Sequence, residues 1–259
     1  MVYPTMDPVA LDFGAVKIHW YGLMYLCAFL AAWSLARLRA RHTDWTADQL
    51  ADLIFYGALG LMLGGRLGYI LFYNFSTYLD NPLAILRIWE GGMSFHGGLI
   101  GGLVAMVLYA RHFKRPVFVV MDFVAPLIPL GLGFGRLGNF INGELWGKVT
   151  DSSWGMVMHD PLLGTVSRYP SQLYEAFLEG LVLFVILWLY SAKKRPLLAV
   201  SAVFFLGYGC FRFLIEFVRV PDAHIGYLSG WLTMGQLLSL PMVVGGALLW
   251  WWSYRQHKA

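Results

Sequence analysis

Polar side chains are concentrated at residues 135–147, where an apolar segment ends and the sequence reads Gly-Arg-Leu-Gly-Asn-Phe-Ile-Asn-Gly-Glu-Leu-Trp-Gly. An arginine guanidinium can hold a phosphate through two hydrogen bonds and keeps its proton, and asparagine amides add neutral donors. Keeping such groups at the mouth of an apolar segment is energetically costly. The 135–147 segment is therefore a candidate site for binding an anionic group and for chemistry on it.

The remaining sequence is typical of a membrane protein. Of its 259 residues, 58% are hydrophobic and 13% are charged, whereas soluble domains have roughly 25% charged residues. A helix needs about 17 to 25 apolar residues to cross a bilayer. Runs of that kind lie near 18–37, 51–73, 96–112, 117–135, 174–191, 199–218 and 231–252. We predict an all-α polytopic membrane protein with seven transmembrane helices.

Basic residues indicate the orientation, because lysine and arginine accumulate in short cytoplasmic loops. Clusters follow alternate segments: Arg37, Arg39 and Arg41; Arg111, Lys114 and Arg115; Lys193, Lys194 and Arg195; Arg255 and Lys258. This alternation predicts a periplasmic N-terminus and a cytoplasmic C-terminus. The net charge of +4 then reflects cytoplasmic anchors, and we expect no nucleic-acid partner.

No internal repeat or linker divides the chain, so residues 1–259 are predicted to form a single transmembrane domain. Two periplasmic loops are expected, at about 74–95 and 136–173. The second alternates apolar and polar residues between turn formers, which predicts a hairpin and a small periplasmic loop subdomain. Residues 1–17 lack a basic stretch and a cleavage site, so no cleavable signal peptide is expected.

Small residues inside the predicted helices have a packing interpretation. Glycines recur at the spacing that lets two helix backbones approach closely: Gly60, Gly64 and Gly68 in one helix, and Gly97, Gly98, Gly101 and Gly102 in another. Cys27 and Cys210 both fall within predicted spans. We expect them to pack as small apolar side chains rather than to form a disulfide or act as nucleophiles.

Charged residues inside the predicted spans need a partner or a function, because an arginine at mid-membrane costs about 2.5 to 3.5 kcal/mol. Two arginines, Arg66 and Arg212, are in this position. Helical geometry places Tyr208, Arg212, Glu216 and Arg219 on one stripe of their helix. The stripe predicts a polar face that looks inward, and a structural ion pair of Arg212 with Glu216 is the alternative.

The predicted topology brings these groups to one leaflet. Arg66, Arg136 and Arg212 lie toward the outer ends of helices that run outward, and Tyr21 and His96 begin helices that run inward. A cavity lined by cations and open to the outer leaflet would suit an anionic phospholipid headgroup.

Motifs along nearly the whole chain resemble those of bacterial prolipoprotein diacylglyceryl transferases. They are Tyr21-Gly22, His96-Gly97-Gly98, the 135–147 segment, Pro170-Ser171-Gln172-Leu173-Tyr174-Glu175, and Tyr208-Gly209-Cys210-Phe211-Arg212 with Glu216 and Arg219. Several members of that family carry histidine before Pro-Ser-Gln, where this chain has Tyr169. No catalytic imidazole is therefore assigned to that position.

The resemblance implies transfer of the diacylglyceryl group of phosphatidylglycerol to the lipobox cysteine thiol of a prolipoprotein. A thioether forms and glycerol phosphate leaves, as the first step of bacterial lipoprotein maturation. The expected partners are phosphatidylglycerol, a prolipoprotein signal peptide with its lipobox cysteine, and membrane lipids. The expected location is the bacterial inner membrane, with the site facing the periplasm. We expect a monomer without cofactor, and no metal, since no Cys, His and carboxylate cluster has ligand spacing.

The resemblance also suggests roles for single residues. His96 is the expected proton acceptor, with a structural hydrogen-bonding role as the alternative, and Arg136 and Arg212 are the expected phosphate-stabilising residues. The predicted substrate-binding residues are Tyr21, Arg66, Asn139, Asn142, Glu144, Gly147, Tyr208, Glu216 and Arg219. Within this set Glu144 is expected to anchor its loop through an arginine or a main-chain N–H, and Gly147 to permit a turn. For Tyr21 and Tyr208 a structural role, either at the membrane interface or in the packed core, remains open.

A small transporter or channel is the second hypothesis, with Arg66, Arg212, Glu216 and Glu175 lining an anion path. A transporter should carry polar residues through to both faces of the membrane. The inner halves of the predicted helices are almost free of charge, which favours a one-sided site. A membrane phosphotransferase acting on another lipid would share this site and differ in its acceptor.

Overall fold

The computed structural model describes the chain except for residues 15, 42, 74, 76, 77, 79, 80, 88–90, 161, 222–225, 229 and 259. The predicted 74–95 loop therefore lies partly outside the described residues. The chain forms two compact units. We call Met1–Ala32 with Asp122–Ala259 the larger unit and Trp33–Met121 the smaller unit, and describe each by itself.

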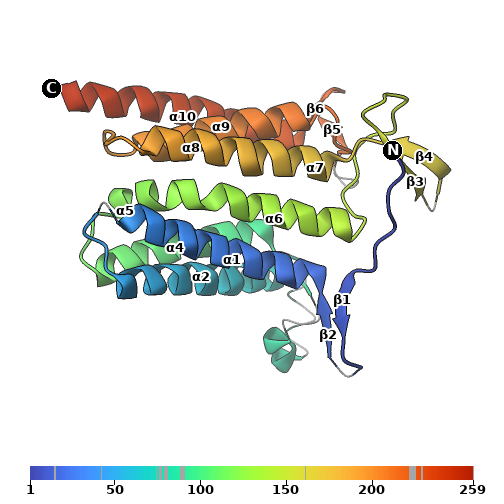
Figure 1. The fold of residues 1–259 in the computed structure, drawn as a ribbon, viewed down its shortest axis with the longest axis horizontal. Helices are drawn as coiled ribbons and strands as arrows, with labels where there is room; N and C mark the ends of the chain where they lie inside the picture. The colour runs from blue at the N-terminus through green and yellow to red at the C-terminus, as the bar shows by residue number, and fades with distance from the viewer. Residues whose placement is uncertain are drawn as a thin grey trace. The chain divides into compact units, whose positions relative to one another are not determined.

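Helices account for most of the described residues (Figure 1). The long helices are α1 (Trp20–Ala40), α2 (Ala47–Tyr73), α4 (Phe95–His112), α9 (Ala199–Ile215) and α10 (Met234–Lys258). Two further helices are composite. In one, α5 (Val117–Val124) continues through the 3-10 turn η3 (Ala125–Leu127) into α6 (Ile128–Ile141). In the other, α7 (Ser171–Glu175) continues through the π-helical turn η4 (Ala176–Val182) into α8 (Leu183–Ser191).

Each apolar segment of the sequence coincides with one of these helices. Within the described part of the chain, five are long and apolar enough to cross a membrane: Trp20–Ala40, Ala47–Tyr73, Val117–Ile141, Ser171–Ser191 and Met234–His257. Ala199–Ile215 is a shorter apolar helix. The predicted class of all-α membrane protein is confirmed at this level, while the count of seven crossings and their direction stay predictions.

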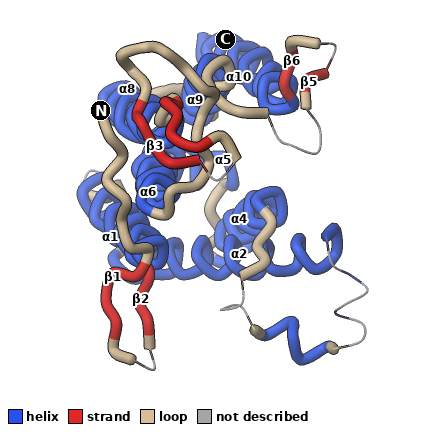
Figure 2. The backbone as a smooth tube through the Cα atoms, turned by 90° about the vertical axis from the view of Figure 1, so that its right-hand side faces the viewer, coloured by secondary structure: helices blue, strands red, loops and turns tan. Residues whose placement is uncertain are grey.

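In the smaller unit, α2 and α4 lie side by side because glycines remove the side chains between them (Figure 2). A Cβ atom on Gly64 would collide with the carbonyl oxygen of Gly97, and one on Gly101 with that of Gly60. Where lipid gives no hydrophobic drive for association, such close approach provides the packing energy. The predicted role of these glycines is confirmed.

The larger unit packs α6, η4, α8, α9 and α10 against one another (Figure 1). Leu183 and Leu187 on α8 meet Ala125 of η3 and Val200 on α9 in a buried apolar core. Gly133 on α6 lies so close to η4 that a Cβ on Gly180 would stand 2.8 Å from the Gly133 Cα. This contact brings α6 against the π-helical turn.

Asp122 fixes the start of α9. Its carboxylate accepts hydrogen bonds from the main-chain N–H of Leu198 at 2.6 Å and that of Ser201 at 2.9 Å. The Ser201 hydroxyl adds a third hydrogen bond at 2.7 Å. The first N–H groups of a helix have no partner within the helix, so a carboxylate at this end stabilises α9.

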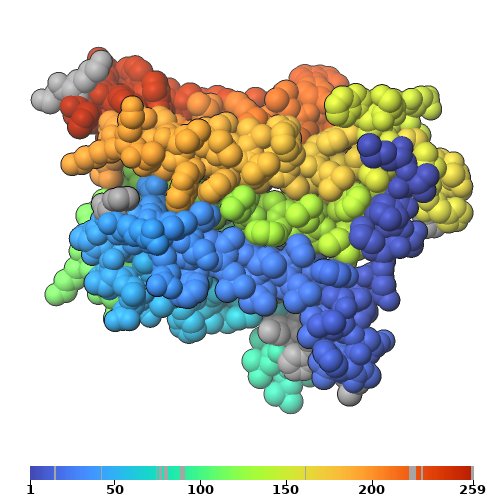
Figure 3. All heavy atoms as spheres, viewed as in Figure 1, coloured from blue at the N-terminus to red at the C-terminus, as the bar shows by residue number. Residues whose placement is uncertain are grey.

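Three two-stranded antiparallel sheets complete the described fold. They pair β1 (Val9–Asp12) with β2 (Lys17–His19), β3 (Met156–Asp160) with β4 (Gly164–Arg168), and β5 (Tyr227–Leu228) with β6 (Leu232–Thr233). The hairpin predicted within 136–173 is thus confirmed as β3 and β4. The first residues of the chain lie against it (Figure 3), and Tyr3 N donates to Val157 O at 2.8 Å.

Candidate active site

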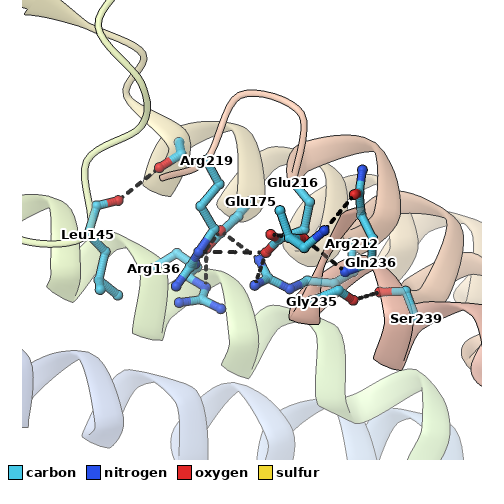
Figure 4. Close-up of polar contacts among 11 residues, drawn as sticks. Arg136, Leu145, Glu175, Arg212, Glu216, Arg219, Gly235, Gln236 and Ser239 are labelled. Carbon is cyan, nitrogen blue, oxygen red and sulfur yellow. Dashed lines mark hydrogen bonds and ion pairs between the residues drawn. The ribbon is translucent and has the colours of Figure 1, made fainter. Parts of the chain in front are cut away.

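Three arginines of the larger unit converge on one buried carboxylate, Glu175, at the end of α7 (Figure 4). Arg136 on α6 places Nε 2.5 Å from Glu175 Oε2. Arg212 on α9 and Arg219, just beyond α9, place Nη1 atoms 3.0 and 2.8 Å from Glu175 Oε1. Glu175 is 1% exposed. A carboxylate so deeply buried is stable because these cations compensate its charge.

Glu216 forms the second anionic point of the network. Its Oε1 lies 2.5 Å from Nη2 of Arg212 and 3.7 Å from Nε of Arg219. The Thr233 hydroxyl donates to Oε2 at 2.7 Å. The ion pair between Arg212 and Glu216, which was the structural alternative for this stripe, is therefore present, and it belongs to a larger network that spans α6, α7 and α9.

The network has more positive than negative charge on its accessible side. The side chains of Arg136, Arg212 and Arg219 are 22%, 16% and 13% exposed, whereas that of Glu175 is 1% exposed and that of Glu216 4%. The carboxylates thus lie beneath the guanidinium groups and orient them. Such an arrangement presents fixed cationic donors to an anionic ligand.

The 135–147 segment leaves α6 in a tight loop held by Glu144. Nδ2 of Asn139 donates to Glu144 Oε1 at 2.8 Å, and Nδ2 of Asn142 donates to the same oxygen at 3.3 Å. The sequence predicted an arginine or a main-chain N–H as the partner of Glu144. Two side-chain amides take that place instead, because Asn139 and Asn142 stand on the last turn of α6 and its C-cap.

The loop rests on the start of α7. The Ser171 hydroxyl donates to the Leu145 carbonyl at 2.8 Å, and the Gln172 amide donates to the Glu144 carbonyl. Ser171 and Gln172 are fully buried. The Pro-Ser-Gln motif and the 135–147 segment are therefore two parts of one structure, since the side chains of the first bond the backbone of the second.

Gly147 has a different role from the one predicted. Its φ is not positive, and the residues that turn the backbone are Gly143 at φ 68° and Leu145 at φ 61°. A Cβ on Gly147 would lie 2.5 Å from Val218 O and 2.8 Å from Tyr169 O. Glycine is needed here for close approach of three backbone segments, which Gly147 N joins by donating to Tyr169 O at 2.8 Å.

Two predicted tyrosines pack within the larger unit. The Tyr21 ring lies against α6, where a Cβ on Gly138 would stand 2.8 Å from its Cδ2. Tyr208 is partly buried, stacks on Phe204 with ring centroids 6.0 Å apart, and borders the apolar core of α8 and α9. Cys27 and Cys210 are free, half-buried thiols.

Arg66 and His96 belong to the smaller unit. Arg66 is 4% exposed, and its nitrogens donate to main-chain carbonyls of residues 84, 85, 87, 91 and 92 at 2.5 to 3.2 Å. It thus holds the loop between α2 and α4. His96 is an exposed residue in the first turn of α4. Substrate binding by Arg66 and proton transfer by His96 stay predictions.

Glu175 is the residue of the network that the predicted site omits. Its signal in the sequence is a carboxylate placed early in the apolar run 174–191, where a charge needs a partner. The partners are Arg136 on α6 and Arg212 and Arg219 at the end of α9 and just beyond it, so helical periodicity within the segment of Glu175 could not name them. Among the described residues, no group of three or more His, Cys, Asp and Glu side chains could hold a metal ion.

Known proteins resemble this chain in sequence over nearly its whole length. A sequence model of the family described as prolipoprotein diacylglyceryl transferase matches residues 8–252. The curated relatives are named phosphatidylglycerol–prolipoprotein diacylglyceryl transferase. One from Hydrogenovibrio crunogenus is 58% identical over 99% of this chain and 97% of its own length.

Two further relatives carry the same name. One from Coxiella burnetii is 57% identical over 100% of this chain and 99% of its own length. One from Pseudomonas aeruginosa is 55% identical over 100% of this chain and 98% of its own length. These names favour the transferase over the transporter hypothesis. The chain belongs to the prolipoprotein diacylglyceryl transferase family.

Proposed function

We propose that this protein transfers the diacylglyceryl group of phosphatidylglycerol to the lipobox cysteine of a prolipoprotein. The observation that carries the proposal is the convergence of Arg136, Arg212 and Arg219 on Glu175. An excess of fixed positive charge at partly exposed guanidinium groups suits a phosphodiester. The names of the relatives supply the donor and the acceptor.

The reaction requires positive charge where the donor breaks. The sulfur of the prolipoprotein thiolate attacks the glyceryl carbon next to the phosphate, a C–S bond forms, and the C–O bond to the phosphate breaks. Its electron pair leaves with the phosphate oxygen as glycerol phosphate. Negative charge therefore grows on the leaving phosphate, and guanidinium donors already held in place by Glu175 and Glu216 stabilise it without reorganising.

The loop held by Glu144 follows Arg136 in the chain, and its Gly147 pairs with Arg219 in an isolated β-bridge. Asn139 and Asn142 hold the Glu144 carboxylate, while Ser171 and Gln172 donate to the carbonyls of Leu145 and Glu144. We assign these residues the task of holding the loop around the headgroup. A site held by several hydrogen bonds keeps its geometry when the substrate binds, which favours turnover.

Seven crossings in the bacterial inner membrane, with a periplasmic N-terminus and site, complete the proposal. The alternation of basic clusters supports this topology, and five long apolar helices with a shorter sixth support a multi-pass protein. Single cysteines at Leu162 and Lys193, in a chain without Cys27 and Cys210, test it in intact cells. A membrane-impermeant thiol reagent should label position 162 and spare position 193. The reverse pattern would contradict the orientation.

Activity is tested by mass spectrometry of a peptide with a Leu-Ala-Gly-Cys lipobox, incubated with the purified protein and phosphatidylglycerol. The expected result is a diacylglyceryl-sized gain on the cysteine, absent with phosphatidylethanolamine as sole lipid. Arg136→Ala should abolish the gain, and Arg136→Lys, which keeps the charge without the planar fork, should restore it only weakly. A folded protein that gives no product would refute the proposal, and ion flux would be measured next. Native mass spectrometry checks the proposed monomer.

A further inference from the structure

Glu179 is a buried carboxyl group that the reaction described above does not use. It lies on the π-helical turn η4 and is 1% exposed. Its Oε1 has no hydrogen-bond partner among the described residues. Buried polar atoms are nearly always hydrogen-bonded, so an unpartnered carboxyl oxygen asks for a functional explanation.

The backbone around Glu179 is also unusual, because it forms a π-helical turn. A π-helical turn is rare and is frequent at functional sites. Here it extends from Ala176 to Val182, between Glu175 at the centre of the arginine network and the apolar helix α8. The close contact of Gly180 with Gly133 holds it against α6, the helix that supplies Arg136.

The electrostatic surroundings of Glu179 are the network itself. The charged and titratable groups that act on it from the neighbouring elements are Glu175, Arg212, Arg136, Arg219 and Tyr208. Any change in the charge of Glu179 is therefore felt by the arginines assigned to the phosphate, because a buried charge is weakly screened.

Glu179 differs from the other three glutamates of the site in its bonding. Glu175 is paired with three arginines, Glu216 with arginines and a hydroxyl, and Glu144 with two amides. Oxygens of these three carboxylates are already occupied by donors from the protein. The oxygen of Glu179 that lacks a donor is free to receive a proton.

The charge balance gives such a proton a consequence. Three arginines against Glu175 and Glu216 leave the network with a net charge of +1. An ionised Glu179 cancels that charge, and a protonated Glu179 restores it. The donor lipid is a monoanion, whereas the leaving glycerol phosphate carries about −1.5 to −2 charges. Positive charge is needed most when the C–O bond breaks.

We propose that Glu179 is the group that accepts the proton of the lipobox thiol, an assignment that rests on the proposed transferase function. The S–H bond breaks and the proton passes to the carboxylate of Glu179. The sulfur forms its bond to the glyceryl carbon, and the phosphate leaves with the electron pair. Protonation of Glu179 thus returns the net charge of the network to +1 as the leaving group becomes more negative. Release of the proton to the departing phosphate or to water resets the site.

The test compares Glu179→Gln with the wild type in the peptide transfer assay between pH 5 and pH 9. Loss of a general base is expected to lower turnover at neutral pH by about 100-fold or more. Without this base the variant reacts only with peptide whose thiol is already ionised. Its rate should therefore rise about tenfold per pH unit up to the thiol pKa near 8.5. The wild-type rate should level off at a lower pH. Binding of phosphatidylglycerol should be retained, because a neutral glutamine leaves the arginine network with its net charge of +1.

A second variant, Glu179→Asp, separates chemistry from structure. It keeps a carboxyl group and should recover a rate well above that of Glu179→Gln, with a wild-type-like pH profile. Equal losses in both variants, or a Glu179→Gln profile identical to the wild type, would refute the assignment. So would a loss of the wild-type profile in His96→Gln, which would make His96 the acceptor. Absence of product from the wild type would instead contradict the transferase function itself.

Discussion

Nε of Arg136 lies 2.5 Å from Oε2 of Glu175, which ties the arginine of the 135–147 segment to α7, the helix that follows the β3–β4 hairpin. The same carboxylate also holds Arg212 and Arg219. Guanidinium groups that share one buried anion cannot move independently. Their relative positions, and so the geometry offered to a phosphate, depend on this single side chain.

Replacing Glu175 by glutamine should therefore damage both stability and activity. The substitution leaves three neighbouring cations without their central anion, and breaking a buried ion pair by removing one partner costs about 3 to 5 kcal/mol. We expect a lower free energy of unfolding in detergent micelles and a loss of transfer of about 100-fold or more. Glu175→Asp, which keeps the charge on a shorter side chain, should retain part of both. Wild-type stability and transfer in Glu175→Gln would show that the network is dispensable.

Gly147→Ala should abolish transfer, because the new Cβ would lie 2.5 Å from Val218 O and 2.8 Å from Tyr169 O. Both neighbours are backbone atoms and cannot turn aside as a side chain would. The matched control is Gly245→Ala on α10, where nothing lies within 4 Å of the added Cβ. Transfer rates of the two variants, measured with the lipobox peptide, should differ by about 100-fold or more. Equal rates would contradict the close-approach argument.

The two amides that hold Glu144 should contribute unequally. Asn139 is buried and donates at 2.8 Å, whereas Asn142 is more exposed and donates at 3.3 Å. A hydrogen bond to a charged group contributes about 1.5 to 3 kcal/mol, so Asn139→Ala should lose most of that amount and Asn142→Ala much less. Unfolding free energies of the two variants check the order. A larger loss for Asn142→Ala would reverse the assignment.

Asp122→Ala should lower stability and leave the catalytic rate per folded molecule unchanged. The carboxylate accepts hydrogen bonds from Leu198 N, Ser201 N and Ser201 Oγ, and losing such a helix cap costs about 0.5 to 2 kcal/mol. Thermal unfolding measures the first effect, and transfer normalised to folded protein measures the second. A changed rate at unchanged stability would show that Asp122 acts on the site.

The β3–β4 hairpin should loosen in acid. Hydrogen bonds from Leu162 N and from the Arg168 guanidinium hold the pKa of Asp160 below its usual range. A depressed folded-state pKa gives stability that is present above the unfolded value of about 4 and is lost as the pH falls through the folded value. Hydrogen exchange of residues 156–168, corrected for intrinsic rates, should therefore accelerate below about pH 4. Asp160→Asn should exchange faster at neutral pH and lack this acid step, and an acid step of the same size in that variant would exclude Asp160 as its cause.

The parts of the site that one helix determines were predictable from sequence. Arg212 and Glu216 stand one turn apart, so helical geometry alone offered their ion pair as the structural alternative, and the structure contains it. Glu175 could not be assigned in this way, because its partners come from α6, α9 and the turn after α9. Periodicity within a segment carries no information about which face of another helix it meets.

Gly147 and Arg66 also show that sequence patterns do not predict contacts between distant segments. Gly147 was predicted as a turn residue, since glycine is common at turns, but the need for it arises from backbone segments distant in sequence. The glycines of α2 and α4 were correctly predicted to pack helices because their spacing within each helix carries that signal. Arg66 was singled out by its burial in an apolar run. Its main-chain partners depend on how the following loop folds back.

The N-terminal contacts have a consequence for the order of assembly during synthesis. The Tyr3 hydroxyl donates to Phe140 O at 2.9 Å, across 137 positions of the chain, and Tyr3 N donates to Val157 O. The ribosome makes the first residues long before their partners exist, and chains grow at about 5 to 20 residues per second. Tyr3 can therefore make these contacts only several seconds later, once α6 and the β3–β4 hairpin have been synthesised and have folded. The site reaches its final form late in biogenesis.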